Sequence, residues 1–103
     1  MGVLSTNQER HADVCRRLNE IYVAKNQDYG DSFGDMFRKL GIITALTRMG
    51  DKLNRLISLS TKPASEQKVL DESIKDTVLD LANYAIMTVM EIEALEVKDD
   101  NCS

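Results

Sequence analysis

The sequence predicts an all-α fold, a bundle of three to four helices completed by oligomerisation. Apolar residues recur at steps of three and four along most of the chain, which is the spacing of amphipathic helices. Aromatic residues are scarce, with no Trp, two Phe and three Tyr, and this composition suits helix packing better than a β-sandwich or barrel. The length of 103 residues indicates one domain, 1–103. We expect its ends, 1–5 and 98–103, to be flexible.

The first predicted helix begins at a polar cap and ends near Val23 or Lys25. Ser5, Thr6 or Asn7 can supply the cap, and Glu9 an early acid. Its apolar face comprises Val14, Leu18, Ile21 and Tyr22. His11 and Cys15 lie one turn apart, but there is no second His and the other Cys is near the end of the chain. We therefore expect a surface pair rather than a metal site.

Residues 25–33, KNQDYGDSF, are predicted to form a loop, because Asn, Asp, Gly and Ser are typical of turns. The segment is dense in groups that can contact a ligand, namely those of Lys25, Asn26, Asp28 and Tyr29. Functional residues are often carried by loops on a rigid scaffold. The alternative is an ordinary solvated turn anchored by Tyr29 and Phe33.

A second helical region begins near Gly34 or Asp35, and Gly41 is expected to interrupt it. From there a regular apolar stripe predicts a seam against another helix: Ile42, Leu46, Met49, Leu53 and Leu56. Gly50 costs this helix about 1 kcal/mol relative to Ala, which a close helix contact or a ligand would explain. Four charged residues lie off the seam: Arg48, Asp51, Lys52 and Arg55. They form either an intrahelical ion-pair strip or a carboxylate among cations that holds a metal and phosphate oxygens.

A polar connection, 60–68, precedes the last helix, which is predicted from about Asp71, or from Ser65 or Glu66, to about Val97. This helix carries two apolar stripes: Leu70, Ile74, Val78, Leu81, Ala85 and Val89, and then Leu79, Ala82, Ile86 and Met90. A helix that is apolar on two faces is central or lies at a subunit interface. Three helices leave too little material to cover it, so we expect a homodimer or homotetramer.

The same helix carries Glu72, Asp76, Asp80 and Asn83 at steps of four, four and three, along one strip. Carboxylates near a core require either basic side chains from another helix or a divalent metal. Carboxylate oxygens suit Mg²⁺ or Mn²⁺, which usually keep waters and bind substrate phosphates. Plausible phosphate contacts are Lys25, Arg48, Lys52 and Arg55. The residues therefore favour metal-dependent chemistry on a phosphate ester or anhydride.

Other functional classes find less support. The chain has no P-loop, no dinucleotide-binding glycine motif, no zinc-type Cys/His pairing and no nucleophile elbow. The net charge of −4 argues against direct nucleic-acid binding. No apolar stretch is long enough to span a bilayer, the N-terminus lacks the core of a signal peptide, and the cysteines suggest reduced thiols. We expect a cytoplasmic protein.

Three blocks of the sequence resemble one small family. They are KNQDYGDSF, then R48-x-x-D51-K52-x-x-R55-L56, then DES-x-x-DT-x-x-DLANYAIM, and they span about Lys25 to Met90. In this order they resemble the phage and bacterial family called nucleotide modification associated domain, type one. That family is grouped with the all-α NTP pyrophosphohydrolases, which include MazG and the dimeric dUTPases.

The resemblance implies oligomeric helical modules that hydrolyse a nucleoside triphosphate to the monophosphate and pyrophosphate, with Mg²⁺ held by acids of two helices. Asp51 matches the first acidic motif, where Asn54 replaces a second Glu. The second motif maps to Asp76 and Asp80, with Glu72 one turn earlier. The nucleoside side would be lined by Asn26, Asp28, Tyr29 and Asn83.

Three hypotheses follow. The first is a Mg²⁺-dependent nucleotide pyrophosphohydrolase, in which Asp51, Asp76 and Asp80 are catalytic and, with Glu72, hold the metal. The second is a nucleotide-binding or assembly module without turnover that serves base-modification machinery. The third is a structural helical oligomer in which Arg48, Lys52 and Arg55 pair with the acids.

Overall fold

The computed structural model describes residues 5–63, 65 and 67–102, with side chains described as far as Val97. This part of the chain contains four α-helices and no strand, which confirms the all-α prediction. Backbone contacts divide the chain into two compact units, Met1–Gly30 and Asp31–Ser103. The first unit holds α1 and the second holds α2, α3 and α4. Across the described residues, no helix has an apolar run long enough to cross a bilayer.

Helix α1 spans Asn7–Tyr29 and has a cap at each end. Thr6 forms a capping box with Glu9: its hydroxyl accepts from the Glu9 N–H at 3.1 Å, and the Glu9 carboxylate accepts from the Thr6 N–H at 3.3 Å. Gly30 ends the helix at φ 68°, a left-handed conformation that favours glycine. Of the predicted caps, Thr6 is therefore the one used.

The predicted loop at 25–33 was wrong. Helix α1 continues to Tyr29 and α2 begins at Ser32, so the connection is only Gly30 and Asp31. Polar residues cost an exposed helix only a few tenths of a kcal/mol each, so they lengthen α1 instead of ending it. The helix ends where a positive φ is needed, and Gly30 supplies it.

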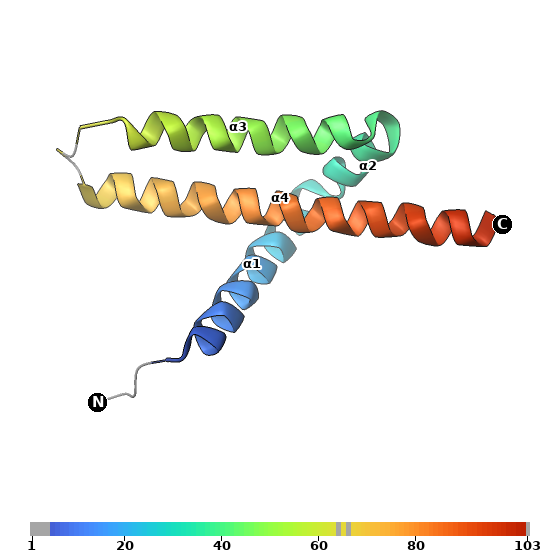
Figure 1. Cartoon of the computed structure of the whole chain (residues 1–103), viewed down its shortest axis with the longest axis horizontal. Helices are drawn as coiled ribbons and strands as arrows, with labels where there is room; N and C mark the ends of the chain where they lie inside the picture. Colours follow the sequence, from blue (N-terminus) through green and yellow to red (C-terminus); the bar gives the residue numbers. More distant parts are fainter. Residues whose placement is uncertain (1–4, 64, 66, 103) are drawn as a thin grey trace. The chain divides into compact units, whose positions relative to one another are not determined.

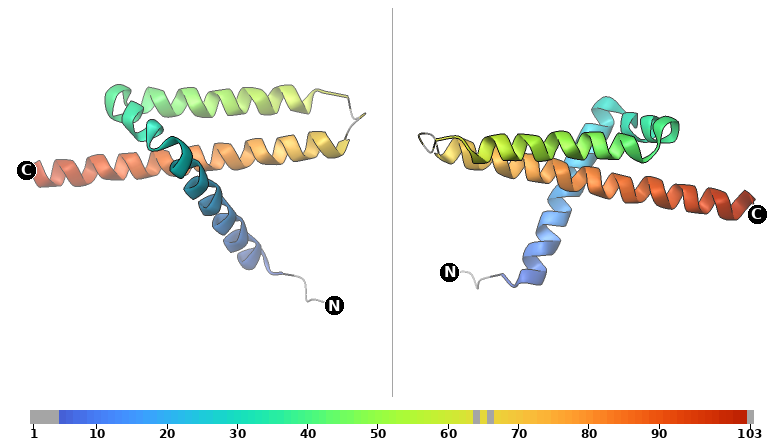
Figure 2. Two further views of the ribbon diagram at one scale, coloured as in Figure 1. Left: turned by 180° about the vertical axis from the view of Figure 1, so that it is seen from behind. Right: turned by 45° about the horizontal axis from the view of Figure 1, so that its top comes forward.

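In the second unit, α2 spans Ser32–Leu40, α3 spans Ile42–Ser60 and α4 spans Gln67–Cys102. The predicted break at Gly41 is confirmed, and this residue has φ 73°. Helix α4 starts before the predicted Asp71 and continues past the predicted end at Val97, while Glu66 lies outside the described residues. Helices α3 and α4 run side by side in opposite directions, and the end of α4 extends beyond α3 (Figures 1 and 2).

The core of this unit is built from the aromatic residues of α2. Phe33, Phe37 and Ala45 are buried, and Met49, Tyr84 and Met87 pack against them. The ring of Phe33 lies 6.0 Å from that of Phe37 and 5.7 Å from that of Tyr84, between centroids. Helix α2 thus fills the angle between α3 and α4, and this packing sets how the two long helices are rotated.

This rotation contradicts the predicted packing seam of α3. Ile42, Leu46 and Leu53 remain 52–55 % exposed, while Leu56 and Met49 are half-buried. In the first stripe predicted for α4, Leu70, Ile74 and Leu81 are half-buried and Val78, Ala85 and Val89 are exposed. The fully buried residues of its described part are polar: Thr77, Asn83 and Thr88. A helical period defines stripes but does not say which stripe turns toward a neighbour within the same chain.

Gly34→Ala is expected to destabilise the second unit by about 0.5–2 kcal/mol, the usual cost of a lost N-cap. Asp31 caps α2 by accepting from the Gly34 N–H at 3.2 Å. A Cβ on Gly34 would collide with the Asp31 carboxylate. Urea unfolding measures the loss, and Asp31→Ala should lose a similar amount. Ser32→Ala is the control, because Ser32 lies outside the contact between Asp31 and Gly34. A smaller loss of unfolding free energy in Gly34→Ala than in Ser32→Ala would contradict the prediction.

Candidate functional site

The acidic strip of α4 meets the cationic strip of α3 at one ion pair. The Lys52 ammonium lies 3.2 Å from a carboxylate oxygen of Asp80. Both side chains are about one quarter exposed, at 28 % and 27 %. The pair therefore sits in a partly desolvated seam that solvent, or a ligand, still reaches.

One turn further along, Arg55 and Thr77 make a second contact. The Arg55 Nε donates to the Thr77 hydroxyl oxygen at 3.2 Å, and that hydroxyl donates its own proton to the Ser73 carbonyl at 2.7 Å. Thr77 is buried, so its oxygen is held in one orientation. Thr77 was missed from the sequence, although it stands beside Asp76 in the third block.

The two contacts establish the antiparallel register, and the neighbouring residues follow from helix geometry. Asp76 lies one turn before Asp80 on the same strip, and is exposed. Arg48 lies one turn before Lys52, level with the buried Asn83. The cationic and acidic strips therefore face each other over about one turn, from Lys52 to Arg55, while Arg48 and Glu72 lie beyond opposite ends of this overlap.

Asp51 is placed differently. It precedes Lys52 by one residue, so its side chain projects about 100° around α3 from the residue that contacts Asp80. It is exposed. The structure thus brings Lys52 to Asp80 and Arg55 to Thr77, whereas Asp51 lies on the outer part of α3.

The acids suit a metal that is shared with a phosphate. Among the described residues, no group of three or more His, Cys, Asp or Glu side chains is placed to hold a metal ion. Mg²⁺ is commonly bound by one or two carboxylates, with waters and substrate phosphate oxygens completing its shell. Asp76 and Asp80, one turn apart, match that smaller requirement.

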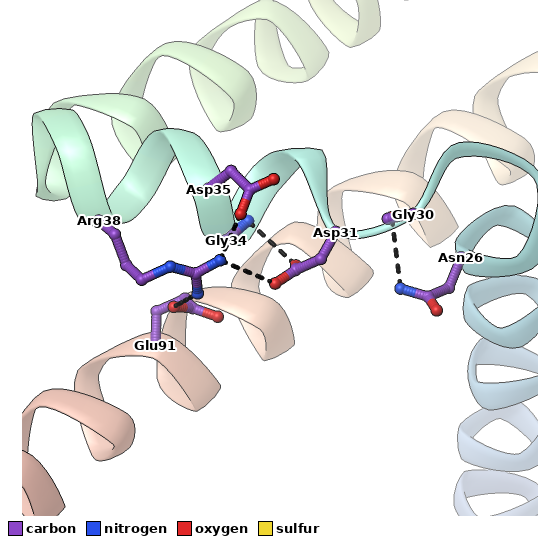
Figure 3. A network of polar contacts seen from close by, with 7 residues as sticks. All are labelled: Asn26, Gly30, Asp31, Gly34, Asp35, Arg38 and Glu91. Carbon is purple, nitrogen blue, oxygen red and sulfur yellow. Dashed lines mark hydrogen bonds and ion pairs between the residues drawn. The ribbon is translucent and has the colours of Figure 1, made fainter.

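A second polar network, which was not predicted, joins α2 to α4 (Figure 3). The Arg38 guanidinium contacts Asp35 at 2.6 Å, Asp31 at 3.2 Å and Glu91 at 3.2 Å. The hydrogen bond to Asp35 raises the pKa of Arg38 most, followed by that to Asp31, so this residue stays charged. The Glu91 side chain is only 14 % exposed. This network holds α2 against α4 and so supports the core beside the seam.

The remaining predicted site residues belong to the first unit. Lys25, Asn26, Asp28 and Tyr29 lie on the last two turns of α1. Tyr29 is 76 % exposed, and the Asn26 amide donates to the Gly30 carbonyl at 3.3 Å (Figure 3). Their part in a nucleoside pocket stays a prediction.

Comparison with known families accounts for most of the chain. The model of the family described as nucleotide modification associated domain 1 matches residues 25–92. The chain belongs to this family. The match runs from the end of α1 through α2 and α3 to Ile92 of α4, so it contains the whole seam. No curated protein and no solved structure matches the chain.

Proposed function

We propose that this member of the family is a Mg²⁺-dependent nucleotide pyrophosphohydrolase, which converts a (d)NTP to the (d)NMP and pyrophosphate. The observation that carries the proposal is the Lys52–Asp80 pair, flanked by Arg55 and Thr77. Cations for phosphate oxygens and acids for a metal meet there in one partly exposed seam. The family description, which refers to nucleotide modification, supports a nucleotide as the ligand.

In this proposal each strip has a separate role. Arg48, Lys52 and Arg55 bind the phosphates, since guanidinium and ammonium groups are the usual donors to phosphate oxygens. Asp76 and Asp80 would hold Mg²⁺, and this ion would supply Lewis-acid chemistry: a lower pKa for a bound water and neutralisation of charge that develops on phosphorus. Water attacks the α-phosphorus, the bond from this phosphorus to the bridging oxygen breaks, and pyrophosphate leaves.

Substrate binding requires a change at the central pair. Lys52 already contacts Asp80, so Asp80 would hold a metal only if the Lys52 ammonium moved from it toward a phosphate oxygen. The pair is partly exposed, and such ion pairs contribute only about 0.2–1 kcal/mol, so this exchange costs little. Nucleotide chemistry of this kind takes place in the cytoplasm of a bacterium or an infected host cell, where we place the protein.

Incubation with each canonical and modified (d)NTP, with Mg²⁺ or Mn²⁺, tests the proposal through pyrophosphate release. We expect release from at least one nucleotide, dependent on the metal and absent from Asp80→Ala. No release from any nucleotide would exclude the enzyme. Nucleotide binding without pyrophosphate release, with the binding measured by calorimetry, would support the second hypothesis, a non-catalytic nucleotide-binding module.

The Lys52–Asp80 contact also favours one alternative, a structural helical oligomer. In that case the cations of α3 serve only to neutralise the acids of α4. Asp80→Ala would then lower the melting temperature, and neither Mg²⁺ nor any nucleotide would raise that of the unaltered chain.

A further inference from the structure

Two cations of α3 lie in the seam, and they differ in what they contact. The Lys52 ammonium pairs with a carboxylate, that of Asp80, at 3.2 Å. The Arg55 guanidinium instead contacts a neutral group, because its Nε donates to the Thr77 hydroxyl oxygen at 3.2 Å. In the part of the chain that the structure describes, Arg55 forms no ion pair with a carboxylate. Its positive charge is therefore not neutralised there, whereas that of Lys52 is.

The Thr77 hydroxyl is held in one orientation. The residue is only 4 % exposed, and its hydroxyl donates to the Ser73 carbonyl at 2.7 Å. A hydroxyl has a single proton, so once this proton is committed to Ser73 the oxygen can meet another group only as an acceptor. The Arg55 Nε–H is such a donor, whereas a phosphate oxygen is not. Thr77 therefore acts on a bound phosphate only through Arg55.

The contact through Nε leaves a defined part of the Arg55 guanidinium for a ligand. This group carries five N–H donors in one plane, of which one is on Nε and four are on the two Nη atoms. Among the described residues, no group accepts a hydrogen bond from either Nη atom of Arg55, and the residue is exposed to solvent. Two Nη atoms side by side form a rigid fork that matches two oxygens of one phosphate group.

We propose that Thr77 is a positioning residue, which fixes the Arg55 guanidinium so that its two Nη atoms bind one phosphate group of the nucleotide. Arg55 is then the first contact of an arriving polyphosphate, because no ion pair has to be broken there. Lys52 lies about 4.5 Å away along the axis of α3 and binds once its ammonium leaves Asp80. The identity of the ligand as a nucleotide rests on the proposed function, whereas the geometry of Arg55 by itself calls for a phosphate group.

Helix α4 contains a second threonine that serves as a matched control. Thr88 is also buried, at 7 % exposed, and its hydroxyl donates to the Tyr84 carbonyl at 2.7 Å. Among the described side chains, none donates to the Thr88 hydroxyl. Thr77→Val and Thr88→Val therefore remove the same kind of bond to the carbonyl four residues earlier, and only the first of them releases an arginine.

Binding of inorganic tripolyphosphate to the full chain, measured by calorimetry without Mg²⁺, tests the proposal without any need for turnover. Thr77→Val should raise the Kd by about 10-fold, on the scale of a hydrogen bond to a charged group. Thr77→Ser keeps the hydroxyl and should stay within about 3-fold of the unaltered chain, and Thr88→Val within about 2-fold. Restoration of binding by serine separates the hydroxyl from the packing of the side chain.

A double-mutant cycle with Arg55→Lys identifies the residue through which Thr77 acts. Lysine keeps the charge but has neither Nε nor the fork, so Arg55→Lys should raise the Kd by about 10-fold. Added to Arg55→Lys, Thr77→Val should raise the Kd by less than a further factor of about 2, because no Nε remains to be positioned. Arg55 is exposed, so Arg55→Lys leaves the fold intact and tests the fork by itself.

Four results would each overturn the proposal: no binding of tripolyphosphate to the unaltered chain, equal Kd values for Thr77→Val and Thr88→Val, unchanged binding in Arg55→Lys, or an undiminished effect of Thr77→Val in the double variant. Pyrophosphate release from nucleotides with Mg²⁺ separates this inference from the proposed enzyme. Tripolyphosphate binding that depends on Thr77, without any release, would exclude the enzyme and support the inference. Release by the unaltered chain, with binding that does not depend on Thr77, would do the reverse.

Discussion

Asp80→Asn is expected to reduce kcat/KM for pyrophosphate release by about 100-fold or more, the scale on which one charge-stabilising group acts in an active site. Asparagine keeps the size of the side chain but removes the charge that pairs with Lys52 at 3.2 Å and that, in the proposed function, binds the metal. The lost ion pair by itself should destabilise the fold by no more than about 1 kcal/mol. Activity should therefore fall far more than stability.

Steady-state kinetics and thermal unfolding of the same preparation separate these two effects. Asp71→Asn is the matched control, because Asp71 is an exposed acid of α4 that accepts from Gln67 at 2.6 Å, away from the seam. Unchanged turnover in Asp80→Asn would contradict the proposed role. A second variant, Asp51→Asn, then shows whether the acid on the outer part of α3 takes part: a loss of similar size would mean that Asp51 reaches the metal in the complex.

Phe37→Ala is expected to destabilise the second unit by about 3–5 kcal/mol, the usual range for removing a buried aromatic side chain. Phe37 is only 4 % exposed and lies in the cluster with Phe33 and Ala45. The described residues include few other buried apolar side chains. Few neighbouring groups can therefore move in to fill the cavity that the substitution leaves. Domains of this size are stable by about 5–15 kcal/mol, so the loss is a large fraction of the total.

Denaturant unfolding followed by far-UV circular dichroism measures this loss. Met36→Ala is the control, because Met36 is the preceding residue of α2 and its side chain is 38 % exposed. Its carbonyl, which accepts from the Thr44 hydroxyl at 3.2 Å, is unaffected by the substitution. Equal losses for the two variants would show that the aromatic cluster is not the core of the unit.

Helix ends were predictable where the signal is local. Thr6 was one of three caps predicted for the first helix, and Gly41 was the predicted interruption, because a cap or a positive φ depends on only a few neighbouring residues. The loop at 25–33 was not, because several turn-forming residues in a row do not end a helix unless one adopts the necessary backbone conformation. Gly30 does so, and its neighbours remain helical.

The candidate site was predictable as two strips but not as a set of contacts. The spacing of Asp76 and Asp80, and of Lys52 and Arg55, places each pair on one side of its own helix. This spacing does not determine the register between α3 and α4. That register makes Lys52 the residue opposite Asp80 and turns Arg55 to Thr77, while Asp51 points elsewhere.

The sequence by itself determined the all-α class, the interruption at Gly41 and the alignment of acids and cations along single helix faces, because these depend on interactions within one or two turns. Only the tertiary structure decided which apolar stripe is buried and which acid meets a cation. Both depend on how each helix is rotated about its own axis. That rotation is set by the aromatic residues of α2, Phe33 and Phe37, which pack between α3 and α4 and leave most of the predicted seam of α3 exposed.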